Sequence, residues 1–243
     1  MNKAALTHKI HSIALDNGLP FNTVLTYFFM ESILYKLVNT GQNVHFVFKG
    51  GFLLSNHLGL SKRATVDIDL LLRNSPLDEN SLTGIVHQIC SSTVVPEVKC
   101  IFQSIEPIRA QDTYGGFRVK ILCRFENIRQ TIPLDIATGD PVFPGPVSYS
   151  YKSLFFEDNL ALLSYNIETI LAEKLETIYK LGLANGRSKD FYDVFIIWRM
   201  REHTIDKQIL SQAIKSTFSY RGTQYDQGDF TTLLKEIEVD SEF

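Results

Sequence analysis

The stretch from Val44 to Leu72, VHFVFKGGFLLSNHLGLSKRATVDIDLLL, decides the fold. Its apolar beginning predicts a strand that ends in Lys49-Gly50-Gly51, and the residues after the glycines are compatible with a short helix. A second strand is predicted around Asp67 and Asp69. The order strand, glycine turn, helix, strand therefore brings two glycines and two aspartates into one short segment.

The two aspartates are predicted to share one face of the second strand. Side chains alternate along a strand, so Asp67 and Asp69 point to one side while Val66, Ile68 and Leu70 point into the core. Neighbouring carboxylates repel unless a cation lies between them. Mg²⁺ takes oxygen ligands from one or two carboxylates and from substrate phosphates. The pair indicates metal-dependent phosphoryl chemistry, and the alternative is a solvated strand face.

The paired glycines are predicted to lie where the first strand turns into the helix. Without Cβ atoms, Gly50 and Gly51 allow backbone N–H groups to approach a phosphate at the positive helix end. A triphosphate then fits between this turn and the aspartates. Lys49 is a further candidate phosphate contact, although a lysine that ends a strand is typically exposed to solvent. Glycine turns of this kind are common, so neither half of the site is specific alone.

A third acid is predicted in the strand Thr131–Ala137. Ile132, Leu134 and Ile136 share one face, which leaves Asp135 on the opposite face of an otherwise apolar strand. A buried aspartate without a partner is unfavourable. We interpret Asp135 as the third metal-binding carboxylate; the alternative is a strand-end residue that a turn satisfies.

The helical part of the chain contributes one lysine of interest. A helix that starts near Asn166 has an apolar stripe, and Lys174 lies on that stripe. A lysine on an inward face needs an ion pair or a bound anion. Asp190 and Asp193 fall in the first turns of the next helix, where carboxylates favour the helix dipole. The predicted apolar stripe of this next helix comprises Phe191, Val194, Phe195 and Trp198.

Four blocks in this order resemble a known family. They are Lys49–Gly51 (KGG), Arg63–Leu70 (RATVDIDL), Ile170–Leu175 (ILAEKL) and Arg187–Asp193 (RSKDFYD). Together they resemble the AbiEii/AbiGii toxins, which are nucleotidyltransferases of the DNA polymerase β-like superfamily from abortive-infection and type IV toxin–antitoxin systems. The resemblance covers about residues 44–198.

The resemblance implies nucleotidyl transfer with Mg²⁺ as cofactor. An acceptor hydroxyl attacks the α-phosphorus of an NTP and pyrophosphate leaves, with two Mg²⁺ ions stabilising the attacking and leaving oxygens. The implied catalytic and metal-binding residues are Asp67, Asp69 and Asp135, with Lys174 as a catalytic residue at the phosphates. The candidate nucleotide-binding residues are Lys49, Gly50, Gly51, Arg63, Thr65 and Lys174, together with Asp190, which would orient Lys174 or Arg187.

The acceptor remains open at this stage. The resemblance implies growth inhibition by modification of a cellular target, for example the 3′ end of tRNA, and a cognate antitoxin as partner. A basic strand face with Arg118, Lys120 and Arg124, joined by Arg187 and Lys189, could guide RNA; the simpler interpretation is a solvated outer face of an antiparallel sheet. The alternatives are an aminoglycoside-type transferase that acts on a small molecule and a nucleotide- or RNA-binding regulatory module without turnover.

Composition and pattern predict two domains. The 243 residues are 44% hydrophobic with a net charge of −3. We expect an α/β (α+β) polymerase β-type nucleotidyltransferase domain with a mixed sheet over residues 1–160, followed by a helical domain over 161–243. Residues 6–38 read as two helices broken near Gly18–Pro20, and residues 78–90 as a third. No signal peptide or membrane span is apparent, so a cytoplasmic location is expected.

Overall fold

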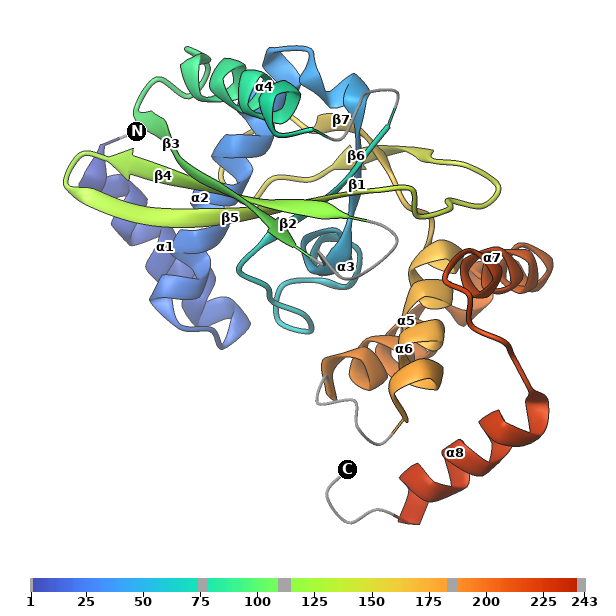
Figure 1. Cartoon of the computed structure of the whole chain (residues 1–243). Helices are drawn as coiled ribbons and strands as arrows, with labels where there is room; N and C mark the ends of the chain where they lie inside the picture. Colours follow the sequence, from blue (N-terminus) through green and yellow to red (C-terminus); the bar gives the residue numbers. More distant parts are fainter. Residues whose placement is uncertain (1, 74–77, 109–114, 183–187, 240–243) are drawn as a thin grey trace. The chain divides into compact units, whose positions relative to one another are not determined.

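The chain forms two compact units, each of which combines two separate segments. The computed structural model describes residues 2–73, 78–108, 115–182 and 188–239 (Figure 1). The first unit comprises residues 1–139 and 147–164, and the second comprises 140–146 and 165–243. These bounds differ from the predicted division at residue 160, because a short loop before the last two strands belongs to the second unit.

The first unit is built on a seven-stranded mixed sheet with the strand order β3-β4-β5-β2-β1-β7-β6. Strand β2 pairs with β5 in parallel, as β1 does with β7, and the other pairs are antiparallel. The α/β class with a mixed sheet is therefore confirmed. The strands are β1 Phe46–Lys49, β2 Ile68–Leu72, β3 Val98–Ile108, β4 Gly116–Phe125, β5 Ile128–Thr138, β6 Val147–Tyr151 and β7 Leu160–Ser164.

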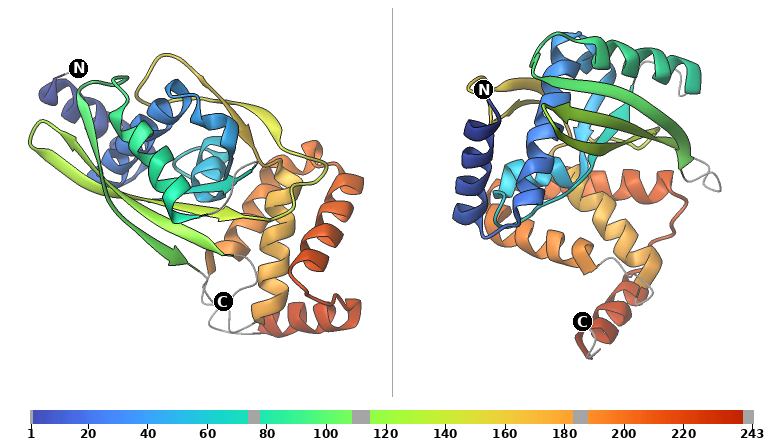
Figure 2. Two further views of the ribbon diagram at one scale, coloured as in Figure 1. Left: turned by 45° about the horizontal axis from the view of Figure 1, so that its top comes forward. Right: turned by 90° about the vertical axis from the view of Figure 1, so that its left-hand side faces the viewer.

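Two helices precede the sheet, as the sequence predicts. Helix α1 (Lys3–Asn17) ends at Gly18, whose φ of +63° forms a left-handed C-cap, and α2 (Phe21–Asn39) follows. Figures 1 and 2 show α1 beside α2, which packs on the sheet. Helix α2 is buried on all sides from Val24 to Leu37. A helix that is surrounded by the protein in this way is a core helix.

The polar residues buried in α2 have hydrogen-bond partners. Glu31 accepts hydrogen bonds from the Tyr151 hydroxyl at 2.9 Å and from the Leu154 N–H at 2.9 Å. Burial raises the pKa of Glu31. The Lys36 Nζ donates to the carbonyls of Ser92 and Val94, both at 2.7 Å. These contacts fix the loops around α2, since a buried polar group without a partner would be unfavourable.

The predicted order of strand, glycine turn, helix and strand is present. A 3₁₀ turn η1 (Gln42–His45) leads into β1, α3 (Gly50–Leu58) follows, and β2 returns antiparallel to β1. One detail of the prediction is wrong. Strand β2 begins only at Ile68, so Asp67 lies in the preceding loop, and Val66 is 58% exposed rather than in the core. Ile68 and Leu70 are buried as predicted.

The long antiparallel part of the sheet forms its two faces as predicted. Helix α4 (Glu79–Ser91) has bounds close to the predicted residues 78–90, and it packs against β3. On β4 the side chains of Val119 and Ile121 are buried, while Arg118, Lys120 and Arg124 occupy the opposite face. This second face carries the site described below.

The described part of the second unit is helical or irregular, as the sequence predicts. Its elements are α5 Ile167–Leu181, α6 Ser188–Arg201, η3 Glu202–Thr204, α7 Lys207–Tyr220 and α8 Gln227–Val239. Helix α5 is the centre of the unit, since both α6 and α7 pack on it. Over the described residues, neither this unit nor the first contains a helix long and apolar enough to cross a bilayer.

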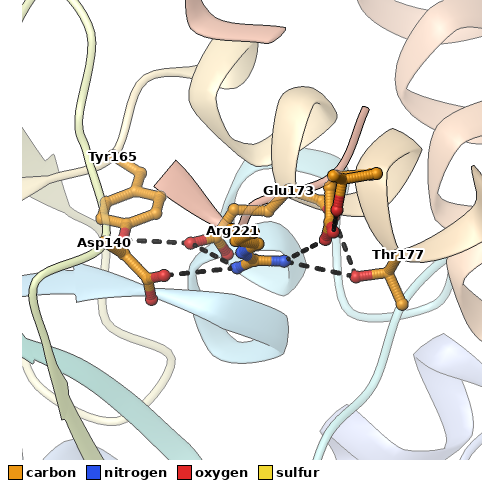
Figure 3. A network of polar contacts seen from close by, with 7 residues as sticks. Asp140, Tyr165, Glu173, Thr177 and Arg221 are labelled. Atoms are coloured by element: carbon orange, nitrogen blue, oxygen red, sulfur yellow. Dashed lines mark hydrogen bonds and ion pairs between the residues drawn. The ribbon is translucent and has the colours of Figure 1, made fainter. Parts of the chain in front are cut away.

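A largely buried arginine joins three segments of the second unit (Figure 3). The Arg221 guanidinium, just after α7, lies 2.8 Å from the Glu176 carboxylate and 3.4 Å from both Glu173 and Asp140. Glu173 also accepts a hydrogen bond from the Tyr165 hydroxyl at 3.2 Å. The network therefore attaches the loop 140–146 and the end of α7 to α5.

Candidate active site

A row of charged residues crosses the sheet of the first unit. Lys49 on β1 is in register with Asp69 on β2, which is in register with Asp135 on β5, which is in register with Arg118 on β4. Residues opposite each other on paired strands share a face. Four strands from two separate stretches of the chain thus bring two carboxylates together between two cations.

Asp67 completes a cluster of three carboxylates with Asp69 and Asp135. One carboxylate oxygen from each residue lies within 4.8 Å of the others, which is close enough for one ion to bind all three. Burial and then the negative charge of Asp67 raise the pKa of Asp69 to about 6, while Lys49 lowers it. A cation would relieve this repulsion. The all-oxygen donor set fits a hard divalent ion such as Mg²⁺.

Both glycines are required because Asp69 and Thr65 lie too close to the turn for a side chain at Gly50 or Gly51. Gly50 has a φ of +71°, and a Cβ atom there would lie 1.9 Å from the Asp69 Oδ2. A Cβ at Gly51 would lie 2.8 Å from the Thr65 Oγ1. The Gly51 N–H donates a hydrogen bond to Asp69. The glycine turn thus holds the Asp69 carboxylate at the start of α3, where backbone N–H groups favour an anion.

Thr65 and Arg63 lie on the other side of the turn. The Thr65 hydroxyl donates to Asp67 at 2.5 Å, and the Thr65 N–H donates to the Tyr27 hydroxyl at 3.0 Å. Arg63 places its Nη2 3.3 Å from the Cβ position of Gly51. Tyr27 has no sequence signal that places it beside Thr65, because its position in an aromatic helix indicates only core packing.

Lys49 and Arg118 differ from their predicted environments. Lys49 is 8% exposed, so the expectation of a solvent-exposed lysine is wrong; β1 is an inner strand and Asp69 lies beside it. Arg118 was expected on a basic face, yet its guanidinium donates to both oxygens of Asp135, at 2.7 and 2.6 Å. Both cations therefore belong to the acidic cluster.

Lys174 lies in a second cluster, within the second unit. Its Nζ is 3.0 Å from Asp190 Oδ1 and 2.6 Å from Asp193 Oδ2. The lysine side chain is 16% exposed, Asp190 is 9% exposed and Asp193 is fully buried. The ion pair that the sequence left open is therefore present. Among the residues that the structure describes, Asp190 Oδ2 has no hydrogen-bond partner, and Arg187, its other predicted partner, lies outside them.

The buried face of α6 is not the predicted one. Asp190, Asp193 and Ile197 face inward, whereas Phe195 is 58% and Trp198 is 40% exposed. The acids turn inward because Lys174 on α5 needs counter-charges there. The sequence pattern of α6 allows either face, so only the packing of α5 on α6 decides between them.

The fold and the site together define the class of protein. A mixed sheet in which a strand, a glycine turn and a helix lead to two acids, with a third acid on the parallel neighbouring strand, is the arrangement of a polymerase β-type nucleotidyltransferase. The family comparison is more specific. Residues 32–242 match the family described as "Nucleotidyl transferase AbiEii toxin, Type IV TA system", so the chain belongs to this family of nucleotidyltransferases.

Solved structures agree on the fold. MenT4, a nucleotidyltransferase toxin from Mycobacterium tuberculosis H37Rv, is 20% identical with a TM-score of 0.60, over 90% of this chain and 76% of that chain. A putative nucleotidyltransferase from H. pylori is 17% identical with a TM-score of 0.53, over 92% of this chain and 86% of that chain. Curated proteins gave no match.

Proposed function

We propose that this protein transfers a nucleotide from an NTP to an acceptor hydroxyl with the help of Mg²⁺ bound by Asp67, Asp69 and Asp135. The observation that carries the proposal is the meeting of these carboxylates within 4.8 Å at the glycine turn. When bound there, Mg²⁺ would neutralise the charge of the transferring phosphoryl group and its leaving oxygen.

The chain's own groups have the following proposed roles. Asp69 and Asp67 hold the ion, and Asp135 holds it from the neighbouring strand and accepts the proton of the acceptor hydroxyl. The start of α3, formed by Gly50 and Gly51, faces the triphosphate. Three residues beside it supply charge or hydrogen bonds to the phosphates: Lys49, Arg63 and Thr65.

Lys174 is proposed as a further phosphate contact, with Asp190 orienting its amine. The support is the AEKL block together with the ion pair of 3.0 Å between the two side chains. Asp190 retains one carboxylate oxygen without a partner among the described residues, so it has capacity for another donor.

The catalytic proposal can be tested by pyrophosphate release. Purified protein is incubated with each of the four NTPs and Mg²⁺, and the rate is compared with that of Asp69→Asn and Asp135→Asn. Each substitution removes a ligand charge and is expected to lower the rate by about a thousandfold or more. Asp16→Asn, on the exposed surface of α1, serves as the matched control. A folded Asp69→Asn variant with wild-type turnover would contradict the site.

RNA is the proposed acceptor class, and a row of exposed cations supports it. Lys99 on β3, Arg124 on β4 and Arg129 on β5 are directly in register. Like charges opposite each other destabilise a sheet, and a phosphate backbone would offset this repulsion. Arg118 and Lys120 serve less well for RNA, because Asp135 and Glu106 already pair with them.

The distance along the sheet suits a polymer. Arg124 is six residues from Arg118 on β4, which corresponds to about 20 Å along a strand. An RNA whose backbone crosses the cation row could therefore present a terminal ribose hydroxyl at the acidic cluster. A small aminoglycoside-like acceptor would need no contact at that distance.

The acceptor test uses labelled NTP, Mg²⁺ and total cellular RNA. Label in the RNA, protein and small-molecule fractions is compared for wild type and the triple variant Lys99→Ala/Arg124→Ala/Arg129→Ala. We expect label in RNA that falls at least about tenfold in the triple variant. Lys207→Ala/Lys215→Ala/Lys235→Ala makes the same charge change on exposed positions of α7 and α8. Label found only in protein or small molecules would rule out RNA.

Because the chain belongs to a toxin family, we also propose that it is toxic to the cell and that an antitoxin neutralises it. We expect growth inhibition on induction, relief by a neighbouring gene product, and a cytoplasmic site of action. Expression of Asp69→Asn at equal level should leave growth unaffected. Turnover without growth inhibition would separate the transferase activity from the toxin role.

A further inference from the structure

Arg118, which is not one of the proposed metal ligands, pairs with Asp135, which is one of them. The guanidinium Nε and Nη2 donate to the two carboxylate oxygens at 2.7 and 2.6 Å. This geometry is bidentate, which is the strongest arrangement for an arginine and a carboxylate. The Asp135 side chain is 18% exposed, whereas that of Arg118 is 43% exposed. Arg118 is therefore the more exposed partner of the pair.

Arg118 acts electrostatically on the whole cluster. Hydrogen bonding and charge attraction by Asp135 raise the pKa of Arg118, and Asp67 and Asp69 raise it further. The guanidinium is always charged in proteins. A divalent cation that binds an oxygen of Asp135 therefore shares this carboxylate with a permanent positive charge.

We propose that Arg118 competes with the divalent cation for Asp135 and thereby lowers the affinity of the cluster for free metal. The inference rests on the proposed function, because it takes the three aspartates as the metal site. Its consequence is that metal alone binds weakly, and that binding is strong only when the anionic triphosphate offsets the repulsion between the two cations.

A neighbouring ion pair provides a contrast on the same strand face. Lys120 pairs with Glu106 at 2.8 Å, but both side chains are well exposed, at 39% and 53%. Glu106 is not one of the clustered carboxylates. Loss of the Lys120 charge should leave metal binding nearly unchanged, because solvent screens this pair.

The expected size of the effect follows from Coulomb's law. A unit charge about 6 Å from a divalent ion opposes its binding by about tenfold in Kd even at the dielectric constant of water. A lower effective dielectric constant increases this factor. Removal of the Arg118 charge should therefore tighten metal binding at least about tenfold.

The experiment measures Mn²⁺ binding to the full chain without nucleotide, by the EPR signal of free Mn²⁺. The proteins are wild type, Arg118→Met, Arg118→Lys, Lys120→Met and Asp69→Asn. We expect Arg118→Met to bind Mn²⁺ at least about tenfold more tightly than wild type. Arg118→Lys should lie between them, because it keeps a charge and loses the bidentate contact. Lys120→Met should stay within about twofold of wild type.

The outcomes separate the inference from the proposed function. Unchanged or weaker binding by folded Arg118→Met and Arg118→Lys overturns the inference, since weaker binding means that Arg118 orients Asp135 for the metal. Mn²⁺ binding by Asp69→Asn equal to wild type means that the cluster is not the metal site, and the proposed function then fails. Far-UV circular dichroism and thermal unfolding show whether each variant is folded.

Discussion

At the scale of single residues, Asp69 carries most of the electrostatic conflict of the site. Burial and Asp67 raise its pKa to about 6, above the usual value of 3.8. The folded protein therefore binds a proton at Asp69 between about pH 4 and pH 6 that the unfolded chain has lost. The contribution of Asp69 to the free energy of unfolding is therefore greatest below about pH 4, and it is lost as pH rises through about 6.

Asp69→Asn should remove this penalty. In the presence of a chelator, we expect the variant to be more stable than wild type by roughly 3 kcal/mol at pH 7.5 and by only about 1 kcal/mol at pH 4.5. Urea unfolding at the two pH values measures the difference, with Asp16→Asn as control. Added Mg²⁺ should then stabilise wild type and leave Asp69→Asn unchanged. Equal effects of the substitution at both pH values would contradict the raised pKa.

Gly50 is the residue at which backbone and site constrain each other. Its φ of +71° disfavours any side chain, and a Cβ there would lie 1.9 Å from Asp69 Oδ2. Gly41 has a φ of +70° with nothing within 4 Å of the added Cβ. Both alanine variants thus incur a similar backbone cost of about 1 to 2 kcal/mol, and only Gly50→Ala also displaces Asp69.

The two glycine variants should therefore differ in function more than in folding. We expect Gly50→Ala to lose nucleotidyl transfer and Mn²⁺ binding almost completely, whereas Gly41→Ala keeps both. Pyrophosphate release and Mn²⁺ titration on the folded variants measure this difference. If Gly41→Ala lost activity as well, left-handed strain alone would explain the effect.

At the scale of elements, α5 and α6 are joined by one buried lysine and two acids. Lys174→Met leaves the buried Asp190 and Asp193 without their counter-charge, and we expect a loss of about 3 kcal/mol in the free energy of unfolding. The double variant Lys174→Met/Asp193→Asn removes one of the two charges and should recover part of that stability. Denaturant unfolding provides the measurement.

The same variants separate structure from chemistry. If Lys174 also contacts the triphosphate, the double variant regains stability but stays defective in NTP binding or transfer. The loss of transition-state stabilisation, calculated from the ratio of the kcat/KM values, should be roughly 2 kcal/mol or more. Recovery of both stability and turnover would assign Lys174 to the ion pair alone.

At the scale of the whole second unit, Arg221 holds three segments together. Its contacts with Asp140, Glu173 and Glu176 are shielded from solvent, since the side chain is 16% exposed. Arg221→Met should cost about 3 kcal/mol or more, because three carboxylates lose their cation. Thermal unfolding and limited proteolysis of the full chain would detect it, with Lys180→Met as an exposed control on α5. Unfolding unchanged from wild type would contradict this role.

For the whole molecule, the net charge of −3 opposes nucleic acid while the cation row attracts it. Transfer to RNA should therefore weaken as salt increases. The expected slope of log K for RNA binding against log salt concentration is about −2, as three single-strand phosphate contacts give. The triple alanine variant of the row should lose most of this slope. Pyrophosphate release without RNA should vary little over the same range, and a steep salt dependence there would attribute the effect to NTP binding.

The sequence alone determined the elements that local pattern controls. The order from β1 to β2 around Gly50 and Gly51 followed from an apolar run, two glycines and an alternating acidic strand. The break between α1 and α2 followed from Gly18 and Pro20, and the shared face of Arg118, Lys120 and Arg124 on β4 followed from strand alternation. The family blocks then gave the class of nucleotidyltransferase.

Only the tertiary structure decided which charges meet. The contact of Arg118 with Asp135 depends on the register of β4 with β5, and the burial of Lys49 depends on the position of β1 inside the sheet. The inward turn of Asp193 depends on Lys174 in another helix. Periodicity describes the two faces of one element, but the partner of each face comes from residues on another element. The ionic partners of the site were therefore beyond the reach of local pattern.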